Sequence, residues 1–64
     1  MSKSHNIEIV NDLMVVLDED GNGYDCHVLT SLTEAQDQLE KWKDEYSFDY
    51  GEAQAAVAEF FAVQ

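Results

Sequence analysis

The spacing of the apolar residues changes once along this chain of 64 residues, and the change restricts the folds that it can adopt. From Ile7 to Leu17 every odd-numbered position except Asn11 is apolar. Such a period of two is typical of a β-strand with one buried face. After Ser31 the apolar residues recur at spacings of three and four, which is the period of an amphipathic helix. The sequence therefore predicts strands first and helices afterwards.

The first apolar segment has two interpretations, which differ at Asn11 and Asp12. It forms either one long strand with an irregularity there, or two strands joined by a tight turn, which an Asn-Asp pair permits. The next strand is expected at residues 24–29, YDCHVL. Between these segments lies DEDGNG, residues 18–23, whose glycines and asparagine suit the positive φ angles of a hairpin loop.

Pairing the strands across this loop places apolar side chains opposite one another. The expected pairs are Leu17 with Tyr24, Val15 with Cys26, and Leu13 with Val28. The opposite face is then expected to be the solvated side of the sheet, and it carries Met14, Val16, Asp25 and His27. Cys26 is accordingly predicted to be buried and His27 to lie at the surface.

Two helices are predicted in the remainder of the chain. Ser31 and Glu34 fit a capping box, in which each side chain satisfies a free backbone amide of the first helical turn. The apolar stripe of this helix is Leu32, Ala35, Leu39, Trp42 and Tyr46. After a break at Ser47-Phe48, Asp49 and Glu52 fit a second cap. The buried face of the second helix is predicted to be Ala53, Ala56, Val57, Phe60 and Phe61.

The predicted fold class is α+β. A small antiparallel β-hairpin or three-stranded sheet is followed by two α-helices packed on one face, which is the simplest way to bury both apolar stripes. A chain of this length makes one domain, so residues 1–64 are expected to form a single small acidic domain with residues 1–5 as a frayed tail.

The segment DEDGNG also resembles the first half of a calcium loop. Asp18, Asp20 and Asn22 fit the first three ligand positions and Gly23 fits the glycine, but Leu29 stands where a bidentate glutamate is required. We therefore expect a turn with, at most, a weak adventitious cation site. The single cysteine and two histidines do not suffice for a typical zinc site. No catalytic motif is present, so we expect no enzymatic activity, no metal and no cofactor.

The charge is the most unusual property of the sequence. Fourteen Asp and Glu residues stand against three lysines and no arginine, which gives a formal net charge of −11. Such a field repels nucleic acids and anionic membranes and attracts basic surfaces. We therefore do not expect the protein to bind DNA or RNA directly. We expect it to bind a basic protein that itself binds nucleic acid.

The carboxylates suggest a mimic of the nucleic-acid backbone. In the first predicted helix, Glu34, Asp37, Glu40 and Asp44 form a row of carboxylates that rises by roughly 4.5 to 6 Å from one to the next, close to the spacing of phosphates along a strand. The hypothesis is an acidic inhibitor that occupies the basic groove of its partner; small acidic proteins of this kind are often encoded by phages or mobile elements against host defence or transcription. Residues predicted to contact the partner are Asp18, Glu19, Asp20, Glu34, Asp37, Glu40 and Asp44, with Phe48 and Tyr50 as exposed aromatic anchors.

Two alternatives remain open at the level of sequence. One is a protein-interaction module that uses an apolar or aromatic patch, such as an adaptor, an antitoxin-like partner or a homodimer. The other is a protein of a salt-rich cell, whose acidity serves solubility. A lone cysteine and the lack of a long apolar segment lead us to expect a cytoplasmic protein, in the host cell if the gene is viral, without contact to membranes.

Overall fold

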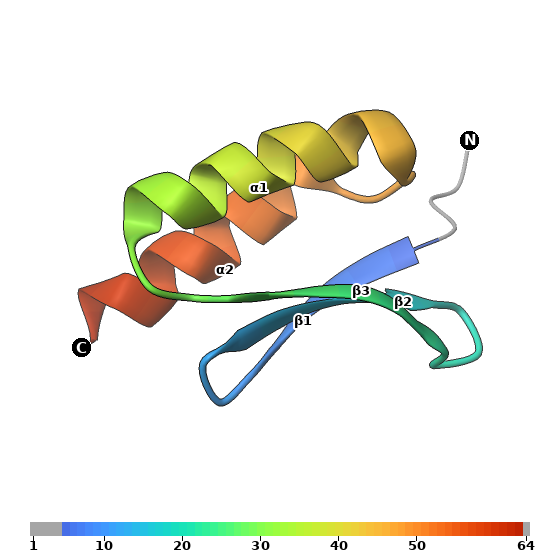
Figure 1. Ribbon diagram of the computed structural model, residues 1–64, viewed down its shortest axis with the longest axis horizontal. Coiled ribbons are helices and arrows are strands. Elements are labelled where there is room, and N and C mark those ends of the chain that lie inside the picture. The colour runs from blue at the N-terminus through green and yellow to red at the C-terminus, as the bar shows by residue number, and fades with distance from the viewer. Residues whose placement is uncertain (1–4, 64) are drawn as a thin grey trace.

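The computed structural model describes residues 5–63, which form three strands followed by two helices (Figure 1). The elements are β1 (His5–Val10), β2 (Leu13–Asp18), β3 (Gly23–Val28), α1 (Leu32–Glu45) and α2 (Tyr50–Ala62). The strands form an antiparallel sheet in the order β1-β2-β3, and both helices lie on the same side of it (Figure 1). The predicted α+β class is confirmed, in its three-stranded form.

A two-residue turn at Asn11 and Asp12 separates β1 from β2, so the interpretation with two strands is the correct one. Asn11 has a φ of 57°. Asparagine enters this left-handed region more readily than most residues, which explains its place in the turn. The turn pairs Val10 with Leu13 and thereby sets which side chains of β1 and β2 share a face.

The buried face of the sheet is the one that we expected to be solvated. Met14 and Val16 are fully buried. The turn sets Ile9 opposite Met14 and Ile7 opposite Val16, and both isoleucines pack against the core. Because Glu8 lies between them on the other side of β1, the isoleucine face is the one that the helices can cover. The buried face predicted from the cross-strand pairs of β2 and β3 alone is therefore wrong.

Strand β3 begins and ends one residue earlier than the predicted range 24–29. Leu17 pairs with Gly23 rather than with Tyr24, because the register shifts between Val16 and Leu17. The shift leaves Tyr24 as an extra residue in β3. Such an irregularity is a β-bulge, which increases the local twist of the strands. The other two predicted pairs, Val15 with Cys26 and Leu13 with Val28, are confirmed.

The inverted faces also correct the expectations for Cys26 and His27. Cys26 is exposed on the outer face of the sheet. His27 is half-buried, and its Nε2 atom is buried without a hydrogen-bond partner among the residues described. Asp25 accepts hydrogen bonds from the indole Nε1 of Trp42 at 3.2 Å and from the backbone N–H of Cys26 at 2.9 Å. Asp25 therefore ties the sheet edge to α1.

Helix α1 begins as predicted, with the Ser31 hydroxyl accepting the backbone N–H of Glu34 at 3.2 Å. The capping box is only half made, because the Glu34 carboxylate accepts the Thr30 hydroxyl at 2.6 Å instead of the backbone N–H of Ser31. Within the predicted stripe, Ala35, Leu39 and Trp42 are buried and Tyr46 is half-buried. Leu32 is 37% exposed, contrary to expectation, because it is the first residue of the helix.

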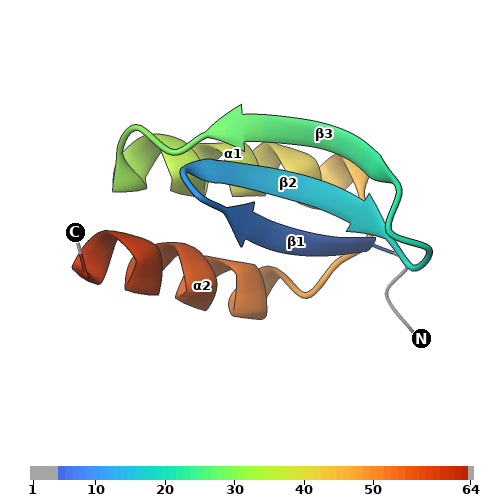
Figure 2. The ribbon, with the colours of Figure 1, turned by 90° about the horizontal axis from the view of Figure 1, so that it is seen from below.

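Helix α2 runs alongside β1, whereas α1 lies behind β2 and β3 (Figure 2). The Asp49 carboxylate accepts the backbone N–H of Glu52 at 3.0 Å, which confirms the second cap. The predicted face is buried at Ala53 and Val57 and half-buried at Ala56, Phe60 and Phe61.

The N-terminal strand starts earlier than the predicted frayed tail allows. His5 belongs to β1, and its backbone N–H donates to the carbonyl oxygen of Ser47 at 2.9 Å. This bond joins β1 to the connection between the two helices. The remaining residues of the predicted tail, 1–4, lie outside the described part of the chain.

Candidate binding surface

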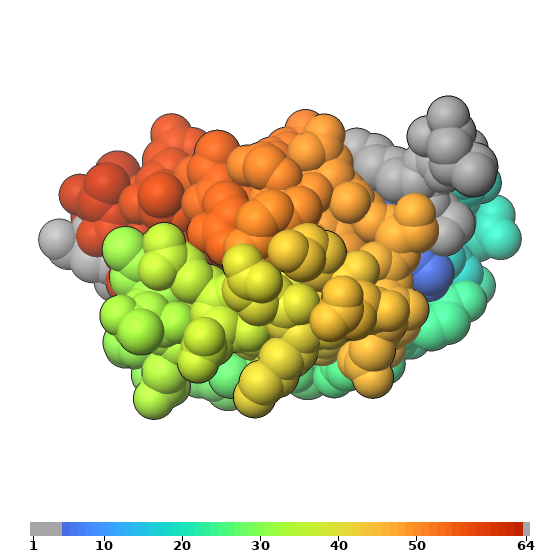
Figure 3. Space-filling view, turned by 90° about the horizontal axis from the view of Figure 1, so that it is seen from above, coloured from blue at the N-terminus to red at the C-terminus, as the bar shows by residue number. Residues whose placement is uncertain are grey.

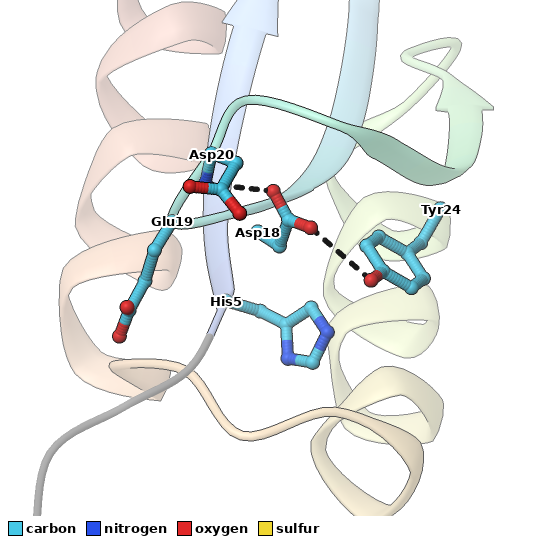
Figure 4. A pocket seen from close by; sticks show the side chains of 5 residues that line it. All are labelled: His5, Asp18, Glu19, Asp20 and Tyr24. Atoms are coloured by element: carbon cyan, nitrogen blue, oxygen red, sulfur yellow. Dashed lines mark hydrogen bonds between the residues drawn. The ribbon is translucent and has the colours of Figure 1, made fainter.

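The loop between β2 and β3 is organised by the carboxylate of Asp18. Its Oδ1 accepts the backbone N–H groups of Asp20 and Asn22, each at 2.9 Å. Its Oδ2 accepts the side-chain amide of Asn22 at 3.2 Å. The same oxygen accepts the hydroxyl of Tyr24 at 3.1 Å (Figure 4). Residue Gly21, with a φ of 90°, supplies the left-handed conformation that glycine favours. The segment DEDGNG is therefore a hairpin turn, and Asp18 is its internal acceptor.

These donors change the acidity of the groups involved. The backbone N–H of Asn22 is the main cause that lowers the pKa of Asp18, because it stabilises the charged carboxylate. A different contact, the hydrogen bond that the Tyr24 hydroxyl donates to the Asp18 carboxylate, raises the pKa of Tyr24. Since its oxygens are already engaged, Asp18 is poorly placed to bind a cation or a basic partner.

Exchange of Asp18 for asparagine is expected to destabilise the protein at neutral pH, because the new amide turns two donors against the donors of Asn22 and Tyr24. A lowered carboxylate pKa contributes stability above the unfolded-state pKa of about 3.9, and that contribution is lost as the pH falls through the folded-state value. The difference in melting temperature between wild type and Asp18→Asn should thus shrink below about pH 4.

The matched control is Asp20→Asn, which removes the same charge from the same loop. The Asp20 carboxylate accepts no hydrogen bond from any described residue, since only its backbone N–H is used. Thermal unfolding followed by circular dichroism between neutral and acidic pH compares the two variants. Equal melting temperatures for both variants at neutral pH contradict the assignment of Asp18 as the structural acceptor.

An open hollow lies beside this loop, lined by His5, Asp18, Glu19, Asp20 and Tyr24 (Figure 4). The Glu19 side chain points away from Asp18, toward solvent (Figure 4). The Tyr24 ring meets the rings of His5 and Tyr46 edge-on, at centroid distances of 5.0 and 6.2 Å. Within residues 5–63 no three His, Cys, Asp or Glu side chains are arranged to hold a metal ion. Glu19 and Asp20 are both exposed, and unlike Asp18 their carboxylates are not engaged by the donors of the loop.

The predicted row on α1 is exposed along its whole length, but its members differ in their partners. Glu40 accepts the hydroxyl of Tyr50, and its carboxylate lies 3.4 Å from the ammonium of Lys43. These two contacts, the Tyr50 hydroxyl first, lower the pKa of Glu40. Lys43 also lies 4.6 Å from the centre of the Tyr50 ring. Glu40 thus belongs to a local cluster that joins α1 to α2, and its charge is partly compensated.

Asp37 and Asp44 are the carboxylates of the row that remain available. Both are exposed, and neither makes a hydrogen bond or an ion pair with another described residue. They are seven residues apart, so they lie on one face of α1 about 10.5 Å from each other. Glu34 is intermediate, because one of its oxygens accepts the Thr30 hydroxyl. Asp37 and Asp44 are therefore the carboxylates of α1 that are free to contact a partner bound to this face.

The two predicted aromatic anchors are less exposed than expected. Phe48 and Tyr50 are both half-buried and pack against the core. Tyr24, by contrast, is 54% exposed. Sequence reasoning placed Tyr24 on the apolar face of the hairpin, and the register shift beside Leu17 moved it to the edge near His5. No local pattern in the sequence predicts this bulge.

The remaining carboxylates also lie at the surface, and none of the described Asp or Glu side chains is buried. All fourteen carboxylates lie within residues 5–63, together with Lys41 and Lys43. Both of these lysines are on α1, in the helical layer that Figure 3 shows from above. Because residues 5–40 contain no lysine or arginine, every full charge of the sheet and its turns is a carboxylate, and the two histidines are the only basic side chains there.

Screening this charge should stabilise the fold. We expect the melting temperature to rise as NaCl is increased from about 0.01 to 0.5 M, because the screening length falls from about 30 Å to a few ångström. Differential scanning calorimetry across the salt series measures the effect. A flat or falling melting temperature means that the carboxylates are compensated within the folded protein.

No family model, curated protein or solved structure matches this chain. The architecture and the surface chemistry are therefore what define it: a three-stranded antiparallel sheet with two helices on one face and an acidic surface. Neither helix within residues 5–63 has the length and apolar character needed to cross a lipid bilayer.

Proposed function

We propose that the protein is a non-enzymatic acidic binding protein that occupies the basic groove of a DNA- or RNA-binding partner. The observation that carries this proposal is the density of exposed charge. The described residues hold fourteen carboxylates and two lysines, a formal charge of −12, on a body 32 Å long. That is about one net charge per 3 Å, close to the one phosphate per 3.4 Å of a single strand in duplex DNA.

The shape is compatible with this role. The molecule measures 32 × 18 × 16 Å, so it is an elongated body with acidic groups along its length. A protein that binds nucleic acid lines its groove with lysine and arginine, and such a groove attracts any rigid body of similar charge density. Asp37 and Asp44 on α1, together with Glu19 and Asp20 in the loop, are the carboxylates best placed to meet those cations.

Binding of this kind blocks the partner without chemistry on a substrate. The protein excludes nucleic acid from the groove, so its effect is inhibition or modulation of the partner. A phage or mobile element gains from such an inhibitor in the host cytoplasm, where the partner serves defence or transcription. The proposal therefore includes this origin and location.

The experiment that tests the proposal is capture of the partner from a nuclease-treated bacterial lysate at low and high salt. Nuclease treatment is needed because bound nucleic acid otherwise fills the groove. The expected partner is a basic, nucleic-acid-binding protein that is retained at low salt and lost at high salt. A partner without nucleic-acid-binding activity, held equally at both salt concentrations, contradicts the proposal.

A further inference from the structure

The outer face of the sheet, away from the helices, is apolar and uncovered. Three rows of paired residues cross the strands on this face. The first two are Val10–Leu13–Val28 and Glu8–Val15–Cys26, and the third, Asn6–Leu17–Gly23, adds one apolar and one polar side chain. Val10 and Val28 are each 50% exposed, and Leu13 and Val15 are only partly covered by their neighbours. Together with Leu17, these residues form a patch that we call the outer sheet face.

This face is also the part of the surface with the least charge. Of the fourteen carboxylates, one, Glu8, lies on it. The others lie at the end of β2, in the turns, on the inner side of β3, or in the helices and their connection. A monomeric protein with so acidic a surface has little reason to keep an aliphatic patch with a single charge, because exposed apolar patches often mark interaction sites.

We propose that the outer sheet face is the contact between two copies of this chain, stacked sheet on sheet. Two sheets pack about 10 Å apart with their strands roughly aligned, and valine and leucine side chains fill the space between them. A basic partner has little to pair with here, because Glu8 is the only carboxylate on the face. A second copy meets instead the same aliphatic rows, which a two-fold axis makes self-complementary.

The stacking also limits repulsion between the two acidic bodies. It places the helical layers on the outside, roughly 30 Å apart, which exceeds three screening lengths at physiological ionic strength. Asp37 and Asp44 of both copies then remain free on opposite surfaces. The dimer is thus independent of the proposed function, because binding of a basic partner needs only one helical layer.

An alternative contact between two sheet edges is disfavoured at β3. Leu29 donates its backbone N–H to Asp12 on the β2 side, so by alternation the N–H of Cys26 points to the free edge. The carboxylate of Asp25 accepts this N–H at 2.9 Å. A carboxylate over the edge repels an incoming strand and occupies a donor that pairing requires.

The size of the face sets the strength of the dimer. Three strands about 4.8 Å apart and six residues of about 3.4 Å each give roughly 300 Å² per copy. A standard stable interface buries about 800 Å² per partner, so this dimer is weak and forms with rising concentration. Because like charges at its rim oppose it, added salt strengthens it, whereas binding of a basic partner weakens with salt.

Sedimentation equilibrium of the full chain from about 10 µM to about 1 mM, at about 0.02 and 0.5 M NaCl, tests the proposal. We expect a monomer–dimer equilibrium whose dissociation constant falls severalfold at the higher salt. The double variant Val10→Thr/Val28→Thr should raise that constant roughly tenfold, since threonine keeps the shape and strand preference but not the apolar surface. The matched control is Val63→Thr at the end of α2, where the side chain is 76% exposed.

Cys26 reports directly on the contact, because its thiol lies in the second row of the outer sheet face. Alkylation by iodoacetamide should slow as the protein concentration rises, and Val10→Thr/Val28→Thr should abolish that protection. Circular dichroism confirms that the variants fold. A monomer at the highest concentration and salt overturns the proposal. So does a dimer that forms equally with Val10→Thr/Val28→Thr and leaves Cys26 reactive, because its contact then lies elsewhere.

Discussion

Replacement of Trp42 by alanine is expected to destabilise the protein more than any other single change considered. The Trp42 side chain is 1% exposed and is the largest of the fully buried side chains. Loss of a buried tryptophan costs about 3–5 kcal/mol, because the cavity that remains is only partly filled. A chain of this length has an unfolding free energy of about 3–10 kcal/mol. The variant should therefore lose a large share of its unfolding free energy, and with a wild-type value at the lower end of this range it is mostly unfolded at room temperature.

The matched variant is Trp42→Phe, which keeps most of the ring but removes the indole N–H that donates to Asp25. Asp25 is exposed, so water can replace the lost donor, and the cost should be nearer 1 kcal/mol. Urea unfolding followed by far-UV circular dichroism gives both values. If the unfolding free energy of Trp42→Ala lies within about 1 kcal/mol of the wild-type value, the core is assigned wrongly.

The double variant Asp37→Asn/Asp44→Asn is expected to weaken binding of the captured partner on the order of tenfold at low salt. Each exchange removes one exposed charge that no described residue neutralises. Association should slow, and the dependence of the affinity on salt should become shallower, because fewer counterions are released from the partner's groove. Surface plasmon resonance at two salt concentrations measures both effects.

The fold should survive this double change, since both side chains point away from the buried face of α1 and relief of repulsion favours the folded state. Lys41→Gln is the control on the same helix, and it should bind as well as wild type or slightly better. A double variant that binds as tightly as wild type, while Val10→Thr/Val28→Thr does not bind, contradicts the acidic mechanism. The apolar outer sheet face is then the better account of partner binding.

Much of the fold was predictable because local signals agreed with one another. The caps at Ser31 and Asp49 were recognised, and the spacing of Ala35, Leu39 and Trp42 identified the buried side of α1. Each of these features depends on residues within a few positions of each other. The exact start of β3 was missed by one residue, since the bulge at Leu17 arises from pairing with a distant strand.

The inward face of the sheet was not predictable from β2 and β3. Strand β2 is apolar on both sides, with Met14 and Val16 on one and Leu13 and Val15 on the other. Only the register with β1 decides between them, and that register depends on whether Asn11 forms a turn. The spacing of apolar residues within either strand therefore does not show which face of the sheet is buried.

The sequence predicts which carboxylates make up the candidate surface, but not which of them are engaged by hydrogen-bond donors within the protein. Sequence reasoning treated the row on α1 and the loop as equivalent charges. The structure divides them, because Asp18 and Glu40 are held by internal donors. Those donors come from the backbone of a turn and from Tyr50, ten residues after Glu40. Their positions follow from tertiary structure, so no spacing in the sequence identifies them.

Competition between this protein and duplex DNA for the captured partner tests the central claim most directly. The partner is immobilised, the protein is bound at low salt, and DNA without bound protein is added in increasing amounts. A shared groove predicts that DNA displaces the protein completely, and that excess protein displaces bound DNA in return. A stable ternary complex of partner, protein and DNA contradicts the claim, because it places the protein outside the groove.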